Sequence, residues 1–267
     1  MLVRTWNVFH GNTKPPQRHV FLEETVRLAV ADAPDIVCLQ EVPPWALPLL
    51  GDWSGYAAVG DVAARPTLGP LPSTAAIGRL LTSLHPGVLR SAFAGQANAV
   101  LVGPRLRVLE HRLLVLNPRR FRKRQASPLG LHVIAQLAWG KERRVCQVLR
   151  IGKGAATFVL GNLHATSYPP DERLADAELL RAATYVDGLA RSDEPVVLAG
   201  DFNVTFERSR TLLDLTAEWG FSRPGTGIDH VLARGFAVEG PRRWPPKRRE
   251  RDSRLLSDHA PVEATLT

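Results

Sequence analysis

Short apolar runs rich in β-branched residues alternate along this chain with polar stretches that contain proline or glycine. Runs of this kind are typical of β-strands. The pattern predicts nine strands, at residues 2–8, 36–41, 97–102, 133–138, 145–151, 157–164, 196–201, 228–232 and 260–266. Apolar positions at helical spacing predict two helices, at 20–32 and 171–190, and a shorter one that begins near Trp45.

The order of these elements indicates the fold class. Strands cluster between residues 97 and 164 with little helix between them, unlike the regular alternation of a doubly wound sheet. Both halves of the chain run strand, helix, then a strand that ends in an acid, Glu41 or Asp201. This order predicts an α+β (α/β) protein, a four-layer αββα sandwich of two packed mixed β-sheets flanked by helices. No stretch resembles an interdomain linker, so we expect a single domain over residues 1–267.

Composition narrows the protein class. The chain is 45% hydrophobic and 22% charged, which is ordinary for a globular protein, and no apolar run approaches the length of a membrane span. The opening MLVRTWNVFHGN lacks the pattern of a secretory signal. Cys38 and Cys146 each lie in an apolar run, which favours reduced core thiols over a disulfide scaffold. We therefore expect a cytoplasmic protein.

Polar side chains follow apolar strand segments at five places: TWNV (5–8), DIVCLQE (35–41), NLHATS (162–167), VVLAGDFN (196–203) and LLSDHAP (255–261). In DIVCLQE, strict alternation places Val37, Leu39 and Glu41 on one face, so that a packed row between the sheets would end in a carboxylate. In VVLAGDFN, Asp201 and Asn203 lie two residues apart on the same side. Carboxylates and amides at strand ends can bind a hard cation, and nearby histidines can transfer protons.

Each of these residues also has an ordinary structural explanation. Glu41 could be a loop residue, His164 a core histidine, and Asp201 and Asn203 turn formers after Gly200. Five such segments in one chain, each at a strand end, favour a functional site over separate coincidences.

The five segments, in this order, resemble the endonuclease/exonuclease/phosphatase superfamily. This superfamily includes pancreatic-type deoxyribonucleases, abasic-site endonucleases, sphingomyelinases and inositol polyphosphate phosphatases. The resemblance extends from Thr5 to Pro261, and its most specific part is LQE followed by GDFN and a near-terminal SDH. It implies a four-layer sandwich that hydrolyses a phosphoester with Mg²⁺ or Mn²⁺, one or two ions.

The resemblance also assigns roles by motif. The metal-binding group, with Glu41 as direct ligand, comprises Asn7, Glu41 and Asp258. The catalytic group, which activates water or contacts the phosphate, comprises His164, Asp201, Asn203, Asp229 and His259. Within it, Asp201 is the base or a second metal contact, and His164 donates to the phosphate or the leaving group. His259 contacts the scissile phosphate, and Asp229 orients it and favours its cationic form.

The sequence departs from the family pattern in places. WNVFHG has one more residue before Gly11 than is usual, which leaves the roles of Phe9 and His10 open. Abasic-site endonucleases carry a tyrosine where this chain has His164, so that activity is disfavoured. Some members pair this histidine with a glutamate, which the sequence does not identify here. The segment GQANAVLV makes Asn98 a candidate for substrate binding.

Positive charge is concentrated in two segments. Lys and Arg exceed Asp and Glu by 8, while residues 117–125 and residues 242–254 each carry a net +5. Such segments attract polyanions. They favour a nuclease acting on DNA, with Arg248, Arg249 and Arg251 binding the nucleic acid. The alternative enzyme is a phosphatase or phosphodiesterase of inositol phosphates or phospholipid headgroups, which the same arginines could serve, and solvated surface loops are the nonfunctional alternative. No obligate protein partner is indicated.

Overall fold

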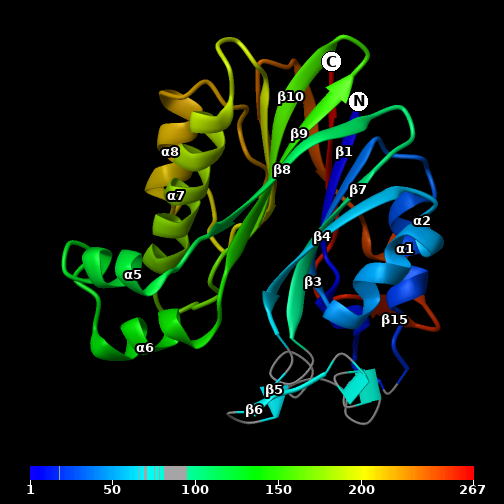
Figure 1. Ribbon diagram of the computed structural model, residues 1–267, viewed down its shortest axis with the longest axis horizontal. Helices are drawn as coiled ribbons and strands as arrows, with labels where there is room; N and C mark the ends of the chain where they lie inside the picture. Colours follow the sequence, from blue (N-terminus) through cyan, green and yellow to red (C-terminus); the bar gives the residue numbers. More distant parts are fainter. Residues whose placement is uncertain (18, 66, 69–70, 75, 78, 81–94) are drawn as a thin grey trace.

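Two mixed β-sheets packed face to face form the centre of the molecule, and helices cover both outer faces (Figure 1). The computed structural model describes residues 1–267 except 18, 66, 69–70, 75, 78 and 81–94. The predicted four-layer sandwich is therefore confirmed. Among the described residues, no helix has the length and apolar character needed to cross a bilayer.

The first sheet has the strand order β13-β16-β1-β3-β7-β4, and the second has the order β12-β11-β10-β9-β8. The strands of the first sheet are β13 (Val238–Arg243), β16 (Val262–Leu266), β1 (Leu2–Asn7), β3 (Ile36–Val42), β7 (Gln96–Val102) and β4 (Ala57–Ala64). Those of the second are β12 (Asp229–Arg234), β11 (Val196–Asp201), β10 (Ala156–His164), β9 (Val145–Lys153) and β8 (Arg107–Val115). Short strands pair outside these sheets: β14 (Glu250–Arg251), β15 (Arg254–Leu256) and β2 (Thr13–Lys14) in one group, and β5 (Thr67–Leu68) and β6 (Leu71–Pro72) in another.

The helices divide between the two outer faces. The helices that accompany the first sheet are α1 (Leu22–Val30) and α2 (Leu50–Ser54), preceded by the 3₁₀ turn η2 (Pro44–Leu49). Those that accompany the second are α5 (Arg119–Ala126), α6 (Val133–Lys141), α7 (Arg173–Leu189) and α8 (Arg210–Ala217). Two further 3₁₀ turns are η1 (Phe9–Gly11) and η3 (Pro246–Arg249). Separate buried clusters fill the space between the sheets, the space under α1 and α2, and the space under α7 and α8.

The strand predicted at 133–138 is wrong, because these residues form α6. Ala135 and Trp139, four positions apart, are buried, whereas Val133, Ile134 and Leu137 are 68%, 70% and 70% exposed. The β-branched pair suggested a strand, but the side chains follow helical spacing and the apolar ones point outward. The sequence patterns also missed strands β4, β8 and β13 and helices α5 and α8.

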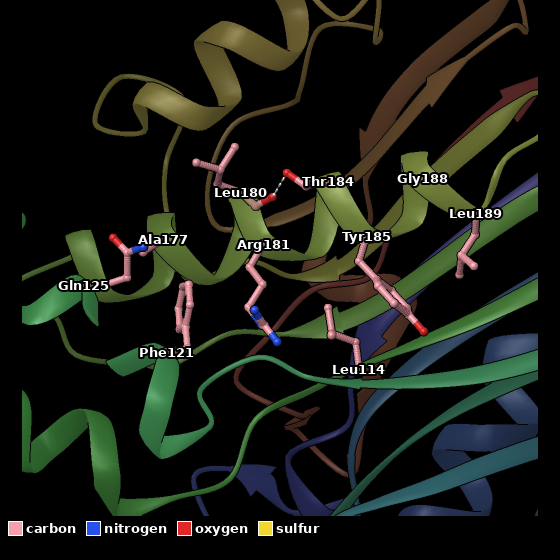
Figure 2. A pocket seen from close by; sticks show the side chains of 10 residues that line it. All are labelled: Leu114, Phe121, Gln125, Ala177, Leu180, Arg181, Thr184, Tyr185, Gly188 and Leu189. Carbon is pink, nitrogen blue, oxygen red and sulfur yellow. Dashed lines mark hydrogen bonds between the residues drawn. The ribbon is translucent and has the colours of Figure 1, made fainter. Parts of the chain in front are cut away.

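A groove with a volume of about 490 Å³ lies on the outer side of the second sheet, between α7 and α5 (Figure 2). Leu114 of β8 lies at its floor, and Arg181 of α7 packs its guanidinium over the ring of Phe121, 4.9 Å from the centroid. His164 and Asp201, at the ends of β10 and β11, do not line this groove.

Candidate active site

Glu41 reaches the cleft between the sheets through a bulge at the end of β3. Pairing with β7 is regular as far as Leu39 opposite Ala99 and resumes at Val42 opposite Ala97. Two residues of β3 thus oppose one of β7 within this interval, and Glu41 takes a left-handed conformation with φ of 54°. A bulge re-aims a side chain in this way, and backbone strain of this kind concentrates at functional sites.

The bulge corrects the alternation expected for DIVCLQE. Val37 and Leu39 face the helices, in the cluster under α1 and α2, whereas Ile36 and Cys38 face the second sheet. Glu41 therefore does not end a row that contains Val37 and Leu39. It enters the cleft because the left-handed residue breaks the period of two.

A layer of buried amides lies directly beneath the cleft. Gln40 donates from Nε2 to Oδ1 of Asn162 at 2.8 Å, and Asn162 donates to the carbonyl oxygen of Ala99 at 3.1 Å. Asn98 is 1% exposed and donates to the carbonyl oxygen of Val145 at 3.2 Å. The structure thus places Asn98 among groups that join the sheets, and the predicted contact of Asn98 with substrate is not what this geometry supports.

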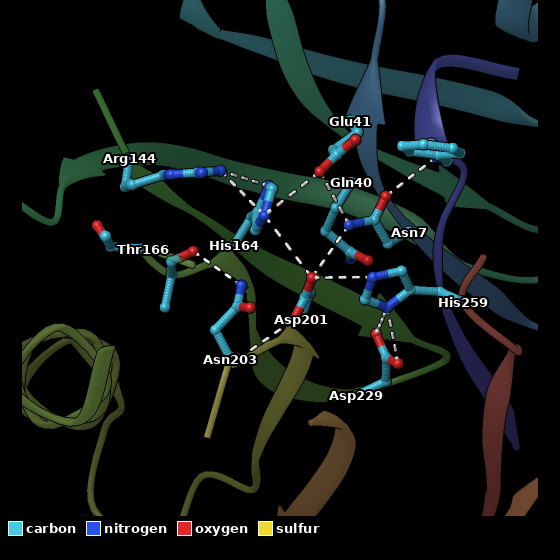
Figure 3. Close-up of polar contacts among 12 residues, drawn as sticks. Asn7, Gln40, Glu41, Arg144, His164, Thr166, Asp201, Asn203, Asp229 and His259 are labelled. Atoms are coloured by element: carbon cyan, nitrogen blue, oxygen red, sulfur yellow. Dashed lines mark hydrogen bonds and ion pairs between the residues drawn. The ribbon is translucent and has the colours of Figure 1, made fainter. Parts of the chain in front are cut away.

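Asp229 and His259 form a hydrogen-bonded pair at the cleft (Figure 3). Both carboxylate oxygens of Asp229 lie 3.0 Å from Nδ1 of His259, and Nε2 points to Asp201, with 3.8 Å to its Oδ2. Burial lowers the pKa of His259, but the bond with Asp229 and the charges of Asp201 and Asp229 outweigh it and raise the pKa to about 10. The imidazole is therefore a cation at neutral pH, with its Nε2 hydrogen directed into the cleft.

Asp201 is the buried carboxylate at the centre of this group. Its Oδ2 accepts from Nδ2 of Asn7 at 3.0 Å, and its Oδ1 accepts from the backbone of Asn203 at 3.1 Å. Burial, followed by the charge of Asp229, raises its pKa to about 7. Asn203 uses its own side-chain amide to donate to the carbonyl oxygen of Ala165 at 3.0 Å, so this amide ties the ends of β10 and β11 together. Asp201 is thus a carboxylate whose burial favours proton uptake, which is a property of a general base.

Close packing of β10 and β11 requires the glycine of the GDFN motif. Gly200 has φ of 145°, and a Cβ atom there would lie 1.9 Å from the carbonyl oxygen of Leu163. No side chain fits at this distance, so Gly200 sets the position of the following Asp201.

His164 lies at the other side of the cleft beside Arg144, a cationic side chain that the sequence motifs did not identify. Nη1 of Arg144 is 3.0 and 2.9 Å from the two ring nitrogens of His164, so the guanidinium lies against the ring. Burial and the charge of Arg144 hold the pKa of His164 well below its usual range. His164 is thus a neutral imidazole, 3.8 Å from Glu41 and 3.7 Å from Asp201, and the cationic donor on this side is Arg144.

The SDH turn is held by hydrogen bonds on both sides. The hydroxyl of Ser257 donates to the carbonyl oxygen of Asn7 at 2.7 Å and accepts from the backbone of His259 at 3.0 Å. Arg249 is buried and donates to the carbonyl oxygens of Leu256 and Ser257 at 2.9 and 2.7 Å. The structure therefore uses Arg249 to position the turn that carries His259.

The neighbouring arginine is also engaged within the protein. Arg248 lies over the ring of Trp244 at 3.6 Å and pairs with Asp32 at 2.7 Å, while the buried Arg4 lies against the same ring at 4.4 Å. Trp244 is 3% exposed. The nucleic-acid track predicted at 242–254 is thus not supported at Arg248 or Arg249. Arg248 and Arg251 are exposed, and Arg251 donates to the carbonyl oxygen of Glu250.

The donor set fits a hard divalent cation. Asn7 holds the carboxylates of Glu41 and Asp201 near each other, donating to them at 3.2 and 3.0 Å. Two partly or fully buried carboxylates this close repel each other, and a divalent cation is the partner that relieves this. Asp258 is exposed and lies 4.0 Å from Nε2 of His259, on the same side of the cleft. Oxygen donors of this kind suit Mg²⁺ or Mn²⁺.

Asp201, Asp229 and His259 also offer ligand atoms within 4.8 Å of one another. Nδ1 of His259 and the carboxylate of Asp229 are already bonded to each other at 3.0 Å, so two of these three groups are engaged within the protein. We therefore assign metal binding to the side of the cleft that holds Glu41 rather than to this trio.

The cleft continues into a cavity of about 240 Å³ that α6 helps to enclose. Glu41, Arg144 and Thr166 line one part of it, and Ala138, Lys141 and Glu142 line the part contributed by α6 and the residue after it. Thr166 is fixed by the fully buried Glu178 of α7, which accepts from both its backbone and its hydroxyl at 2.7 Å. Burial raises the pKa of Glu178 to about 6.

Sequence reasoning missed Arg144, Glu178 and the wall formed by α6. Arg144 stands in the run KERRV just before β9, and a basic residue at a strand end was the available signal. Glu178 was hidden because it follows helical spacing on α7 among residues that pack.

Comparison with known proteins gives the family. The model described as Endonuclease/Exonuclease/phosphatase family matches residues 5–259. A search of curated protein sequences gives no match.

Solved structures share the fold over the whole chain. A functionally unknown conserved protein from Enterococcus faecalis V583 has a TM-score of 0.68 at 16% identity, covering 100% of this chain and 99% of that chain. A mannosyl-6-phosphatase from Bacteroides thetaiotaomicron VPI-5482 has a TM-score of 0.66 at 16% identity, covering 100% and 99%. The human nocturnin catalytic domain with bound sulfate has a TM-score of 0.62 at 13% identity, covering 100% and 93%. The family match and this fold agree with the geometry of the cleft, and the chain therefore belongs to the endonuclease/exonuclease/phosphatase family, whose members are hydrolytic phosphoesterases.

Proposed function

We propose that this protein is a divalent-metal-dependent phosphodiesterase whose chemistry takes place between His259, Asp201 and Glu41. The observation that carries the proposal is the position of His259, held by Asp229 at 3.0 Å, with its Nε2 3.8 Å from the buried carboxylate of Asp201. Hydrolysis of a phosphoester by water uses a base that takes the water proton and a positively charged donor for the phosphate oxygen, and Asp201 and His259 lie close enough to serve one substrate.

Asp201, His259 and Arg144 would each have a separate role in the reaction. Asp201 takes a proton from water as the water oxygen bonds to phosphorus and the bond to the leaving alcohol breaks. The Nε2 hydrogen of His259 donates to a phosphate oxygen that gains charge in the transition state. Arg144 supplies a second positive charge from the opposite wall, since it lines the same cavity as Glu41. A Mg²⁺ or Mn²⁺ ion held by Glu41, with Asp258 and Asp201 nearby, would neutralise the phosphate and stabilise the leaving oxygen.

The test is hydrolysis of bis-p-nitrophenyl phosphate over a series of Mg²⁺ and Mn²⁺ concentrations. Turnover should require the metal, and Glu41→Gln should lower it by about 100-fold or more at limiting metal, because the amide keeps the shape but removes the charge. The matched control is Asp52→Asn, because Asp52 is an acid that lies on α2, far from the cleft. Wild-type turnover by Glu41→Gln at limiting metal would refute the assignment.

DNA and phospholipid headgroups are both candidates for the natural diester. DNA is favoured by the arginines and lysine of α5, which make up most of the basic segment 117–125. A nuclease of this kind should bind duplex DNA with an affinity that falls steeply as salt rises. The exposed apolar side chains of α6, Val133, Ile134 and Leu137, favour the headgroup.

A further inference from the structure

Helices α5 and α6 form a unit that stands off the end of the second sheet, below α7 in Figure 1. Its own small core consists of Leu131, Ala135, Trp139 and Leu174, with the ring of Phe121 5.7 Å from that of Trp139. The indole of Trp139 donates to the buried Glu178 at 2.6 Å, which fixes the unit to α7. The outward faces of both helices are therefore held in a defined orientation.

The outward face of α6 is apolar. Val133, Ile134 and Leu137 are each about 70% exposed, and the latter two are more exposed than the described leucines and isoleucines elsewhere in the chain. Single exposed leucines are ordinary on protein surfaces, but three large aliphatic side chains on one turn of a helix are a patch.

The outward face of α5 is strongly basic. Its exposed residues include Arg119, Arg120, Lys123 and Arg124, and α5 contributes no buried residue. From residue 119 to residue 141 the chain has six lysines and arginines and no aspartate or glutamate. We define these four basic residues together with Val133, Ile134 and Leu137 as the α5–α6 surface.

The same unit borders the active-site cleft. Ala138 and Lys141, on the later turns of α6, line the cavity that contains Glu41 and Arg144. A body that touches the α5–α6 surface is thus brought to the edge of the cleft. Whatever binds the patch is therefore held close to the place where substrate would enter the cleft.

We propose that the α5–α6 surface docks on an anionic lipid membrane. An apolar helix face next to a basic one is the arrangement that inserts between headgroups while the cations meet anionic lipids. The surface is a protruding one, which suits a planar bilayer, and its charge has the sign that an anionic leaflet attracts. Nucleic acid would use the cations but has no need of Ile134 and Leu137 pointing outward.

For the substrate, this inference rests on the proposed phosphodiesterase function. A membrane-docked enzyme meets phosphodiesters in the form of phospholipid headgroups, so the natural substrate class would be a phospholipid. Docking itself can be measured without turnover, and the two ideas therefore fail separately.

The experiment is cosedimentation with vesicles of phosphatidylcholine alone and with about one-third phosphatidylserine, each at low and physiological salt. The wild type should bind the anionic vesicles. Ile134→Ser with Leu137→Ser should lower the partition coefficient by about tenfold or more. Arg120→Gln with Arg124→Gln should lower it similarly on anionic vesicles and more at low salt than at high salt.

Matched controls lie elsewhere on the surface. Leu213→Ser removes an exposed leucine from α8, and Arg107→Gln with Lys153→Gln removes two exposed charges from β8 and β9. These variants should bind vesicles like the wild type. Every variant should keep wild-type turnover of bis-p-nitrophenyl phosphate, which also shows that it is folded.

Three results would overturn the inference: no binding of the wild type to anionic vesicles at low salt, full binding by the α6 double variant, or an equal loss of duplex-DNA binding in that variant. The last would assign the surface to nucleic acid. Vesicle binding in a protein that lacks metal-dependent turnover would support docking and refute the proposed function.

Discussion

Replacing Arg249 by methionine removes a buried guanidinium from the segment that leads to His259. Arg249 is 6% exposed and bonds the carbonyl oxygens of Leu256 and Ser257, and Ser257 in turn bonds the backbone of His259. Arg251, two residues along the same segment, is exposed and bonds only the carbonyl oxygen of Glu250 among the described contacts. The two arginines therefore form a matched pair.

The structure gives the size of the effect. Two hydrogen bonds from a charged donor contribute about 1.5–3 kcal/mol each, and burial of the guanidinium, which lowers the pKa of Arg249, offsets part of this. We expect Arg249→Met to lower the free energy of unfolding by about 2–4 kcal/mol and Arg251→Met by less than about 0.5 kcal/mol. Because the turn carries His259, Arg249→Met should also lower kcat on a small diester by about tenfold or more.

Urea unfolding, turnover of bis-p-nitrophenyl phosphate and a salt series of DNA binding measure the three quantities. A nucleic-acid track along 242–254 predicts a different pattern, in which both variants keep their stability and each lowers the salt slope by about one. That pattern, or equal stability of Arg249→Met and the wild type, would refute the structural role of Arg249.

Further predictions concern the pair formed by Asp229 and His259, and Gly200 of β11. Asp229→Asn should slow turnover less than His259→Ala. The double variant should be about as slow as His259→Ala alone, because the two residues act as one unit. If the losses of the two single variants multiply fully in the double variant, Asp229 and His259 act independently. The pKa of His259 is raised in the folded state to about 10, so its stabilisation is complete below about pH 6.5 and is lost as pH rises toward 10. Urea unfolding in metal-free buffer should thus show a fall of stability between pH 7.5 and 10 that Asp229→Asn flattens, and identical profiles would contradict the pairing. Gly200→Ala should leave the protein largely unfolded by circular dichroism, since its Cβ would overlap the carbonyl oxygen of Leu163, and a native spectrum would contradict the packing.

Most of the sandwich could be predicted because its central strands are buried on both faces. The predicted strands at 36–41, 145–151 and 196–201 are near-continuous apolar runs, and they fall on β3, β9 and β11. Strands at the sheet margins were missed for the opposite reason. β8 alternates exposed residues such as Arg107 and Leu109 with half-buried ones such as Glu110, and β13 is largely polar, so neither has a continuous buried apolar run.

The residues of the cleft could be placed by motif, but their orientation could not. Period-two alternation assigned Glu41 to a row with Leu39, and only the bulge shows how Glu41 turns to the cleft. Charge counting likewise treated 242–254 as a surface track. Whether an arginine is exposed to solvent or bonded to a carbonyl oxygen depends on tertiary contacts, as Arg249 shows. These contacts cannot be predicted from the local sequence.

The frame of the sandwich fixes the groups of the cleft but does not include the α5–α6 unit. Within each sheet a pair of parallel strands, β1 with β3 and β10 with β11, brings its carboxyl ends to the same edge. Asn7 and Glu41 come from the first pair, and His164 and Asp201 from the second, so the large inter-sheet core fixes all four. The α5–α6 unit rests instead on a separate small core and on the bond from Trp139 to Glu178. Its outer side chains can change without disturbing the strands that hold the catalytic groups, so in the proposed membrane-docked enzyme the choice of substrate could change while the catalytic groups stay in place.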